Sequence, residues 1–444
     1  MRDSELFFTQ TKPRRLFFTV AIPGAVSMFM SSLYILVDGI LVGNILGEVS
    51  FAALNLAFPF VLLNFSVADL IGVGSSVSIA IALGEKRKED ANNWFTCACI
   101  MIILCAVFMG GALFILAPWL FRIMGAEGEL AEYAVKYLRV YAVCSPATTI
   151  VFAEDNFLRI CGKIRFSMTL NIVMSILNAG FEFAFLFFLK WGVWAAALAN
   201  CCGMFCCAVI ALIPFIQRKL DLMFVKPAFS KEIVLTTLAG GSPNFLQDMA
   251  GRLTSIVLNA GLLKFGGTMA VSVYGILMYT RDVLQPILYG MFDALQPAIG
   301  YNWGAGNKIR IRRIEQYCFC VTGMISVMFT ALLFFMPKLF IFIFMKDMPT
   351  ESLPTAIMAM KIFSATFLTR WFSFGVQSLM TAIRKPRYAS AISVSTALVF
   401  PLIWIALLWP FKLTGMWMNF PLTSLCAAIL AIVILRRFCQ REFH

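Results

Sequence analysis

The sequence has few charged residues and almost no histidine. Only 13% of its 444 residues are charged, whereas a soluble domain carries about 25% charged residues. The single histidine is His444, so catalysis by Ser-His or Cys-His pairs, histidine metal sites and a histidine proton relay are excluded. We therefore expect neither an ordinary soluble protein nor an enzyme, and the sequence predicts no cofactor and no metal site.

The 13 cysteines form no disulfide framework, and most lie inside apolar runs. Helical spacing could bring four of them together as thiolate ligands, but cysteine is also a small residue that suits close helix packing in lipid. Because metal sites need ionised thiols and usually mixed ligands, we interpret this quartet as packing residues. Its members are Cys201, Cys202, Cys206 and Cys207.

Apolar residues dominate what is present, since 61% of the chain is hydrophobic. A membrane helix needs about 20 to 25 residues, so the chain has room for about a dozen spans and no sizeable domain outside the membrane. The fold class predicted is an all-α integral membrane protein with twelve transmembrane helices. The apolar runs cover approximately residues 16–41, 52–82, 94–118, 133–158, 166–189, 191–214, 233–263, 269–300, 315–343, 354–383, 387–410 and 413–436.

The positive charges predict how these spans are oriented. Of the 36 Lys and Arg residues, 24 lie in the N-terminal segment, the even-numbered connections and the C-terminal segment, and six lie in the odd-numbered connections. Because positive residues concentrate on the cytoplasmic side, we expect both termini in the cytoplasm and a location in a bacterial plasma (inner) membrane. A nucleic-acid binder would instead gather its basic residues on one soluble face, so we expect no nucleic-acid partner despite a net charge of +13.

The chain is an internal duplication with an offset of 220 residues. Each half holds six predicted spans, an even number, so the halves have the same orientation and are related by a pseudo-two-fold axis along the membrane normal. We expect an N-terminal lobe at 1–216, a cytoplasmic linker at 217–231 and a C-terminal lobe at 232–444. The matched pairs include Pro23 with Pro243, Gly47 with Gly267, Gly84 with Gly304 and Lys88 with Lys308.

Two six-helix lobes are typical of alternating-access transporters, and polar residues inside the spans favour this over a structural protein. An uncompensated carboxylate near the bilayer centre costs at least about 2.5 kcal/mol, so such groups face a bundle interior or water and can take up a proton or a cation. A hydrogen-bonded packing role is the alternative. Two stripes in the first half each follow one helix face: Ser27, Ser31, Tyr34 and Asp38, and Asn171, Ser175, Asn178 and Glu182.

The second half has polar stripes in its seventh and eighth spans. Asp248 and Arg252 lie four residues apart and can pair, which makes a structural role as plausible as a functional one. The candidate substrate cavity or second polar site comprises Tyr34, Asp248, Arg252, Asp282, Gln285, Tyr289 and Asp293. Many methionines and phenylalanines, 24 and 44 in number, permit a site for bulky organic cations without demonstrating one.

Several short motifs occur in order along essentially the whole chain, degenerate individually but fairly specific together. They are Ile22-Pro23, Leu36-Val37-Asp38-Gly39, Val42-Gly43, Ile71-Gly72-Val73-Gly74-Ser75-Ser76, Leu83-Gly84-Glu85, Leu158-Arg159-Ile160-Cys161-Gly162-Lys163, Gly415-Met416-Trp417, and Gln296-Pro297-Ala298-Ile299-Gly300-Tyr301-Asn302-Trp303-Gly304-Ala305. These motifs resemble those of the MATE family, the multidrug and toxic compound extrusion transporters of bacterial type.

The resemblance implies secondary antiport, in which inward movement of protons or sodium ions drives amphipathic organic cations out by alternating access. It also implies a cation site in the N-terminal lobe formed by Asp38, Asn178, Glu182 and Asn200. Two of these depart from the family pattern, since Glu182 replaces an aspartate and Asn200 replaces a threonine. Both keep oxygen ligands for a hard cation, but the longer glutamate leaves the identity of the ion open.

Other functions stay as alternatives. Related superfamilies with the same two lobes move lipid-linked oligosaccharides or export polysaccharides, and four cationic residues inside spans suit a pyrophosphate: Arg252, Arg281, Lys361 and Arg370. An intramembrane enzyme or a channel is disfavoured, because the acids are scattered and no repeated selectivity motif is visible. The partners we expect are small organic cations and membrane lipids, with the protein a monomer.

Overall fold

The computed structural model describes residues 3–345, 349–350 and 352–442. Within these ranges the regular structure is helical, with no β-strand, and the helices make up the twelve spans that the hydropathy pattern predicts. The predicted all-α membrane fold is therefore confirmed. A short helix, α1 (Asp3–Gln10), precedes the first span.

Most spans are long helices that begin close to basic residues or end there. These are α2 (Pro13–Leu46), α3 (Glu48–Gly84), α4 (Lys88–Ile123), α8 (Val193–Ile216), α10 (Lys308–Phe335), which α11 (Pro337–Phe344) follows, and α16 (Lys412–Glu442). The element α9 (Lys231–Gly304) contains two spans, because Gly267 with φ of 63° breaks the helix. Glycine takes such a positive φ without the steric cost that a side chain would add.

The remaining spans are interrupted, although the sequence analysis treated each as one run. The interruptions divide them into α5 (Gly128–Thr148) and α6 (Ile150–Ile160), α7 (Ile164–Phe183) and η1 (Ala184–Phe188), α12 (Leu353–Ser364) and α13 (Phe367–Ala382), and α14 (Pro386–Val394), η2 (Ser395–Val399), α15 (Phe400–Leu407) and η3 (Trp409–Phe411). Pro146 explains the first, since proline removes a helix hydrogen bond. Nine helical segments of the described ranges are long and apolar enough to cross a membrane, with α9 counted once and with Ile164–Phe188 and Pro386–Leu407 each counted as one segment.

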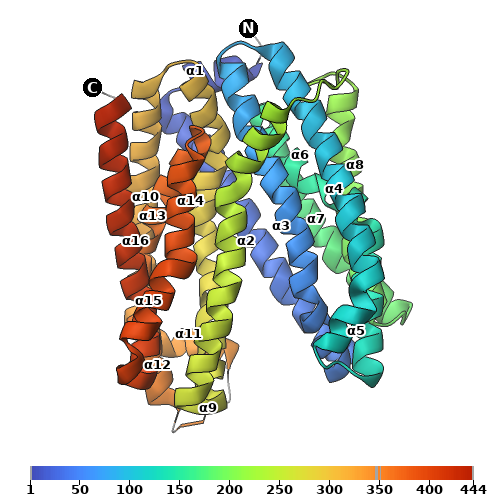
Figure 1. The fold of residues 1–444 in the computed structure, drawn as a ribbon, viewed down its shortest axis with the longest axis vertical. Helices are drawn as coiled ribbons and strands as arrows, with labels where there is room; N and C mark the ends of the chain where they lie inside the picture. The colour runs from blue at the N-terminus through green and yellow to red at the C-terminus, as the bar shows by residue number, and fades with distance from the viewer. Residues whose placement is uncertain (1–2, 346–348, 351, 443–444) are drawn as a thin grey trace. The chain divides into compact units, whose positions relative to one another are not determined.

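The chain packs as two compact units, and Figure 1 colours most of unit 1 from blue to green and most of unit 2 from yellow to red, with the start of α2, in blue, as part of unit 2. Unit 1 contains the residues up to Thr11 and Val26–Gly241, and unit 2 contains Lys12–Ala25 and the residues from Ser242 onward. These boundaries differ from the predicted lobes. The start of α2, up to Ala25, belongs to unit 2 and the first eleven residues of α9 belong to unit 1, so each unit includes the start of the other half's first helix.

Glycine permits close backbone packing where these exchanged segments meet their units. In unit 1, a Cβ on Gly241 of α9 would lie 2.8 Å from the Cα of Leu70 on α3, and a Cβ on Gly74 would lie 2.8 Å from the Gly241 nitrogen. In unit 2, a Cβ on Gly290 of α9 would lie 2.7 Å from the Gly24 carbonyl oxygen of α2. Leu70 and Gly290 are separated by the 220-residue offset of the duplication, and Gly24 and Gly241 by 217 residues, so the two contacts lie at approximately equivalent places in the two halves.

Unit 1 has a core between α3, α4, α5 and α8 that determines where the polar side chains of α2 and α7 point. Fully buried apolar residues from these helices pack together, among them Phe121, Tyr137, Leu138 and Ala197. Helix α7 packs against α8, and α8 packs against α5. The polar stripe of α7 therefore faces α8 inside the unit, as Asn178 and Glu182 show by their burial.

Candidate functional site

Three helices of unit 1 place three predicted side chains, Asp38, Glu182 and Asn200, at a similar distance from their helix ends. Asp38 lies eight residues before the end of α2, and Asn200 lies seven residues after the start of α8. Glu182 lies six residues before the end of η1, the π-helical turn that continues α7. At 1.5 Å per residue, each is about 10 Å from the helix ends that face away from the predicted cytoplasmic loops.

Asp38 is held by two neighbouring polar groups. Its Oδ1 accepts a hydrogen bond from the Asn200 Nδ2 at 3.0 Å and another from the Tyr34 hydroxyl at 3.2 Å. The Tyr34 hydroxyl also contacts the Oδ1 of Asn200. Asp38 is only 7% exposed, so these bonds take the place of water around its carboxyl group. Tyr34, which the sequence analysis assigned to a substrate cavity, is thus part of the predicted ion site.

Asn178 lies beside this cluster and is oriented by α8. In the orientation that satisfies its amide, the nitrogen donates to the carbonyl oxygens of Met174, at 3.2 Å, and Asn200, at 3.3 Å. Its side chain fits against Gly203, where a Cβ would overlap the amide and lie 3.0 Å from its Cγ. Because glycine has no side chain, position 203 leaves the space that the Asn178 amide occupies. Gly203 lies three residues after Asn200 on α8, so helical spacing could have indicated this packing.

Glu182 is the second acid of the cluster, and it is completely buried. Neither of its carboxylate oxygens makes a hydrogen bond to the described residues, although the carboxyl group interacts electrostatically with Asp38 and Tyr34. Two carboxylates that face each other outside water repel, so both can be ionised only if a cation lies between them. One shared proton or one bound cation resolves the repulsion.

Tyr137 on α5 is a further component that the sequence analysis missed. It is fully buried, its hydroxyl has no hydrogen-bond partner among the described residues, and it interacts electrostatically with Asp38 and Glu182. The signal for it was weak, because Tyr137 stands in the middle of an amphipathic helix among charged residues. Its hydroxyl supplies one more oxygen beside the two carboxylates.

The predicted polar residues of unit 2 lie in separate local groups. Asp282 pairs with its neighbour Arg281 at 2.7 Å, with side chains 57% and 41% exposed. Tyr289 stacks on Phe374 with ring centroids 3.5 Å apart and accepts a hydrogen bond from Arg370 at 2.9 Å. These contacts account for Tyr289 and Asp282 without a common ion site.

The other second-half candidates differ among themselves in burial. The carboxylate of Asp293 accepts a hydrogen bond from Gln296 at 2.9 Å, and Gln296 also donates to Ser378 at 2.9 Å. The Nε of Arg252 is buried and has no hydrogen-bond partner among the described residues. Asp248 is exposed and Gln285 is half-buried.

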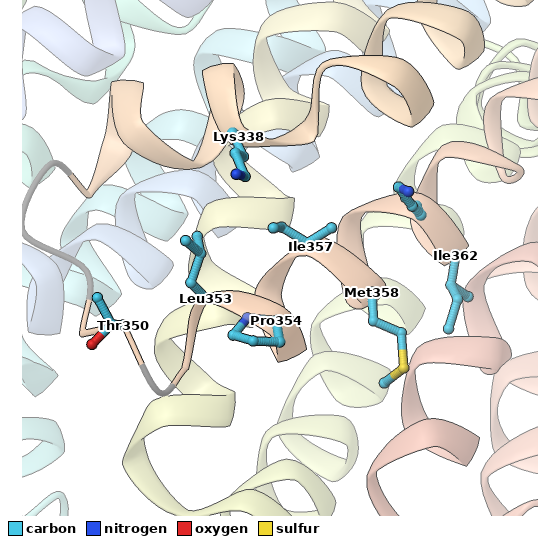
Figure 2. A pocket seen from close by; sticks show the side chains of 8 residues that line it. Lys338, Thr350, Leu353, Pro354, Ile357, Met358 and Ile362 are labelled. Carbon is cyan, nitrogen blue, oxygen red and sulfur yellow. The ribbon is translucent and has the colours of Figure 1, made fainter.

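A separate cavity of about 580 Å³ lies in unit 2 between α11 and α12. Figure 2 shows Lys338 of α11 beside the apolar side chains of α12, including Leu353, Ile357 and Met358. Lys361 also lines it, and its ammonium group lies 5.2 Å from the centroid of the Phe334 ring. Lys361 is one of the four cationic residues that the sequence analysis considered for a pyrophosphate, but none of the residues predicted to bind the coupling ion lines this cavity.

Comparisons with known proteins place the chain among transporters. The family model named MatE matches twice, at residues 23–184 and 244–405. A "Multidrug export protein MepA" from Staphylococcus aureus is 24% identical to this chain, and the match covers 98% of this chain and 97% of the relative's own length. A protein of the same name from Staphylococcus saprophyticus is 22% identical over the same shares of the two chains.

Solved structures give the same fold. One described as the outward-facing conformation of a multidrug resistance MATE family transporter of the MOP superfamily has a TM-score of 0.93 and 22% identity, covering 100% of this chain and 99% of its own. A MOP superfamily transporter from Pyrococcus furiosus, whose title describes a reverse polarity of its binding pocket, has the same values. The two family matches agree with the internal duplication, and together they show that the chain belongs to the MatE family of membrane transporters.

Proposed function

We propose that this protein is an ion-coupled exporter of amphipathic organic cations, with Asp38 and Glu182 of unit 1 as the groups that bind the coupling ion. The observation that carries the proposal is the pair of buried carboxyl groups, Asp38 and Glu182, which interact electrostatically with each other inside unit 1. Such a pair binds one proton or one cation more strongly than an isolated acid would, because binding removes the repulsion.

The cluster suits a proton or a sodium ion because all of its ligand atoms are oxygens. Asp38 and Glu182 supply carboxylates, and Asn200, Tyr34 and Tyr137 supply neutral oxygens around them. Hard cations prefer oxygen ligands. The interactions that these two acids make in the described structure include no lysine or arginine, so the charge of a bound cation is not opposed.

Ion binding has a direct route to the conformation of unit 1. Asp38 is on α2, Glu182 on α7 and Asn200 on α8, so a cation that draws these oxygens together changes the packing of three helices. A ligand shifts a conformational equilibrium only through its different affinity for the two states. Repulsion between Asp38 and Glu182 in the empty site, and its removal in the loaded site, supplies that difference in free energy.

The choice of organic cations as substrates rests on the relatives and on the composition. The curated relatives are named multidrug export proteins, and a chain with 24 methionines and 44 phenylalanines has the flexible and aromatic surfaces that accommodate varied cations. We place the protein in the plasma (inner) membrane with both termini cytoplasmic, as the distribution of lysine and arginine predicts.

The lipid-flippase alternative fits the positions of the arginines less well. A pyrophosphate needs guanidinium groups that are free to form bidentate contacts. Arg281 instead pairs with Asp282, and Arg370 donates to the hydroxyl of Tyr289. Both side chains already have partners within unit 2, which counts against a phosphate site there.

Proton release measured on the purified protein tests the proposed ion site. The protein is placed in a lightly buffered solution without sodium, and the pH is followed while NaCl, or ethidium in a second experiment, is added. Wild type should release about one proton per protein with one of these additions, because cation binding displaces the shared proton. The NaCl and ethidium experiments together show whether sodium occupies the site.

The decisive comparison uses the double variant Asp38→Asn with Glu182→Gln, which removes both acids while preserving their shape. The control is Glu132→Gln, because Glu132 is an exposed acid of unit 1 that pairs with Lys136 at 2.5 Å. Release that is lost in the double variant and retained in the control supports the proposal. Equal release from the double variant and wild type would show that other groups bind the ion.

A further inference from the structure

A third acid of unit 1, Glu154 on α6, is buried without a partner and belongs to none of the clusters described above. Its side chain is 1% exposed, and neither carboxylate oxygen makes a hydrogen bond within the described part of the chain. An ionised carboxylate inside a membrane protein costs at least about 2.5 kcal/mol even on the lenient insertion scale. In this conformation Glu154 therefore carries a proton.

The charged groups near Glu154 do not neutralise it. The adjacent Asp155 pairs with Arg159 at 2.6 Å and accepts hydrogen bonds from Ser167 and Asn171, which makes Arg159 unavailable to Glu154. Burial is the main influence on the ionisation of Glu154, and Cys99 of α4 also interacts electrostatically with it. The titratable or charged side chains on α6 and on the helices packed against it include Asp69 of α3, Cys99 of α4, Tyr141 and Cys144 of α5, Cys207 of α8, and Asp155 and Arg159.

Glu154 lies at the opposite end of unit 1 from Asp38 and Glu182. It is six residues before the end of α6 at Ile160, which corresponds to about 9 Å. The basic connection after this end, with Lys163 and Arg165, is on the predicted cytoplasmic side. Glu154 is thus close to the cytoplasm, yet no water reaches it in this conformation.

A tight helix contact excludes water beside Glu154. The preceding residue, Ala153, packs against Gly72 of α3, where an added Cβ would lie 3.3 Å from the Ala153 Cβ. Two residues further along α3, Gly74 packs against Thr237 and Gly241 of α9. Helix α3 therefore lies between α6 and the exchanged start of α9, so a movement of α9 away from α3 loosens the same segment that covers Glu154.

We propose that Glu154 is a second proton-binding site of unit 1, which holds its proton while the contact between α3 and α6 is closed and releases it to the cytoplasm when that contact opens. In the opening step, the O–H bond of the carboxylic acid breaks and a water molecule takes the proton. The carboxylate that remains is stabilised by the water that has entered. On closing, the carboxylate takes a proton back before it is buried.

Infrared spectroscopy of the full-length protein in liposomes tests the protonation of Glu154 directly. Wild type at neutral pH should show the carbonyl stretch of a protonated carboxylic acid that is absent from Glu154→Gln and retained in Glu132→Gln. Raising the pH should remove this band. If Glu154→Gln and wild type have the same spectrum at neutral pH, Glu154 is ionised and the proposal is wrong. If the band persists at every pH at which the protein stays folded, Glu154 is a permanently neutral packing residue, which also refutes it.

A mutation-free measurement covers the case in which Glu154→Gln does not fold. Cys99 of α4, which is 4% exposed, interacts electrostatically with Glu154, and Cys318 of unit 2 is fully buried and provides the reference. Alkylation of the wild type at stepped pH is quantified at both cysteines by mass spectrometry. Cys99 should become reactive together with the loss of the infrared band, ahead of Cys318. Parallel reactivity of the two thiols would show that the α3–α6 contact does not open.

Neither measurement involves transport or the Asp38–Glu182 pair. A negative result at Glu154 therefore leaves the proposed coupling site untouched, and a failure of the coupling site leaves this proposal standing.

Discussion

The substitution Gly203→Ala tests whether Asn178 contributes to ion binding. A Cβ at position 203 would overlap the Asn178 amide, and would also lie 3.1 Å from the Asn178 backbone nitrogen. The amide must then rotate away and lose its hydrogen bonds to Met174 and Asn200. Overpacking costs about 1–3 kcal/mol, and alanine regains about 1 kcal/mol of helix propensity, so the loss of stability should be about 1 kcal/mol and the protein should fold.

The effect on the ion site should exceed the effect on folding. One hydrogen bond contributes about 0.5–1.5 kcal/mol, and 1.4 kcal/mol corresponds to a factor of ten in affinity. Loss of the positioned Asn178 should therefore weaken binding of the coupling ion about 10-fold. The assay is ethidium efflux from inverted vesicles as a function of the concentration of the driving ion, with the concentration for half-maximal rate as the readout.

The matched control is Gly180→Ala, in the same helix as Asn178, where an added Cβ meets nothing within 4 Å. This variant should keep the ion dependence of wild type and be slightly more stable. The reasoning would be refuted if Gly203→Ala folded and kept the ion dependence of wild type, or if both variants shifted it equally.

Two further predictions concern stability and are checked by thermal unfolding in detergent. Gly241→Ala should destabilise the protein by about 1–3 kcal/mol, because its Cβ would collide with the Leu70 backbone of α3. The control Gly251→Ala, whose Cβ would meet nothing within 4 Å, should not destabilise it. A Gly241→Ala variant with the stability of wild type would contradict the close contact. Glu442→Gln should lower the stability of the protein by at most about 1 kcal/mol at low salt and by less at high salt. The reason is that Glu442 pairs with Lys308 at 3.4 Å and with Lys385 at 3.3 Å, and these side chains are partly exposed. A loss of stability that does not depend on salt would exclude an ionic cause.

Hydropathy and duplication predict much of this fold because each membrane span must satisfy its own backbone and match the bilayer thickness. They do not predict the interruptions, such as the end of α5 after Pro146, since the apolar run continues across them. Nor do they predict that Lys12–Ala25 and the start of α9 pack in the other half's unit. That exchange depends on close packing at Gly74, Gly241 and Gly290. In the sequence Gly74 stands out only as part of a motif, and Gly241 and Gly290 are not singled out.

The proposed cluster was predictable in part because helical spacing puts Asn178 and Glu182 on one face, and because a carboxylate inside a span is expected to face the bundle interior. Proximity of Asp38 to Asn200 on α8 came from the resemblance, and the geometry agrees with it. Tyr137 could not be predicted, because its position depends on how α5 packs against α8 and the rest of the unit 1 core. In the second half, the polar stripes of the seventh and eighth spans, both in α9, predicted one polar site. In the structure Asp282 instead forms an ion pair with Arg281.

The most direct test of the coupling claim is ethidium efflux from inverted vesicles under an imposed proton gradient and, separately, an imposed sodium gradient. Wild type, Asp38→Asn and the exposed-acid control Glu132→Gln are compared at equal amounts in the membrane. The account predicts that one gradient drives efflux by wild type and by the control, and that Asp38→Asn loses this gradient-driven component. Efflux by Asp38→Asn at the rate of wild type under the same gradient would contradict it.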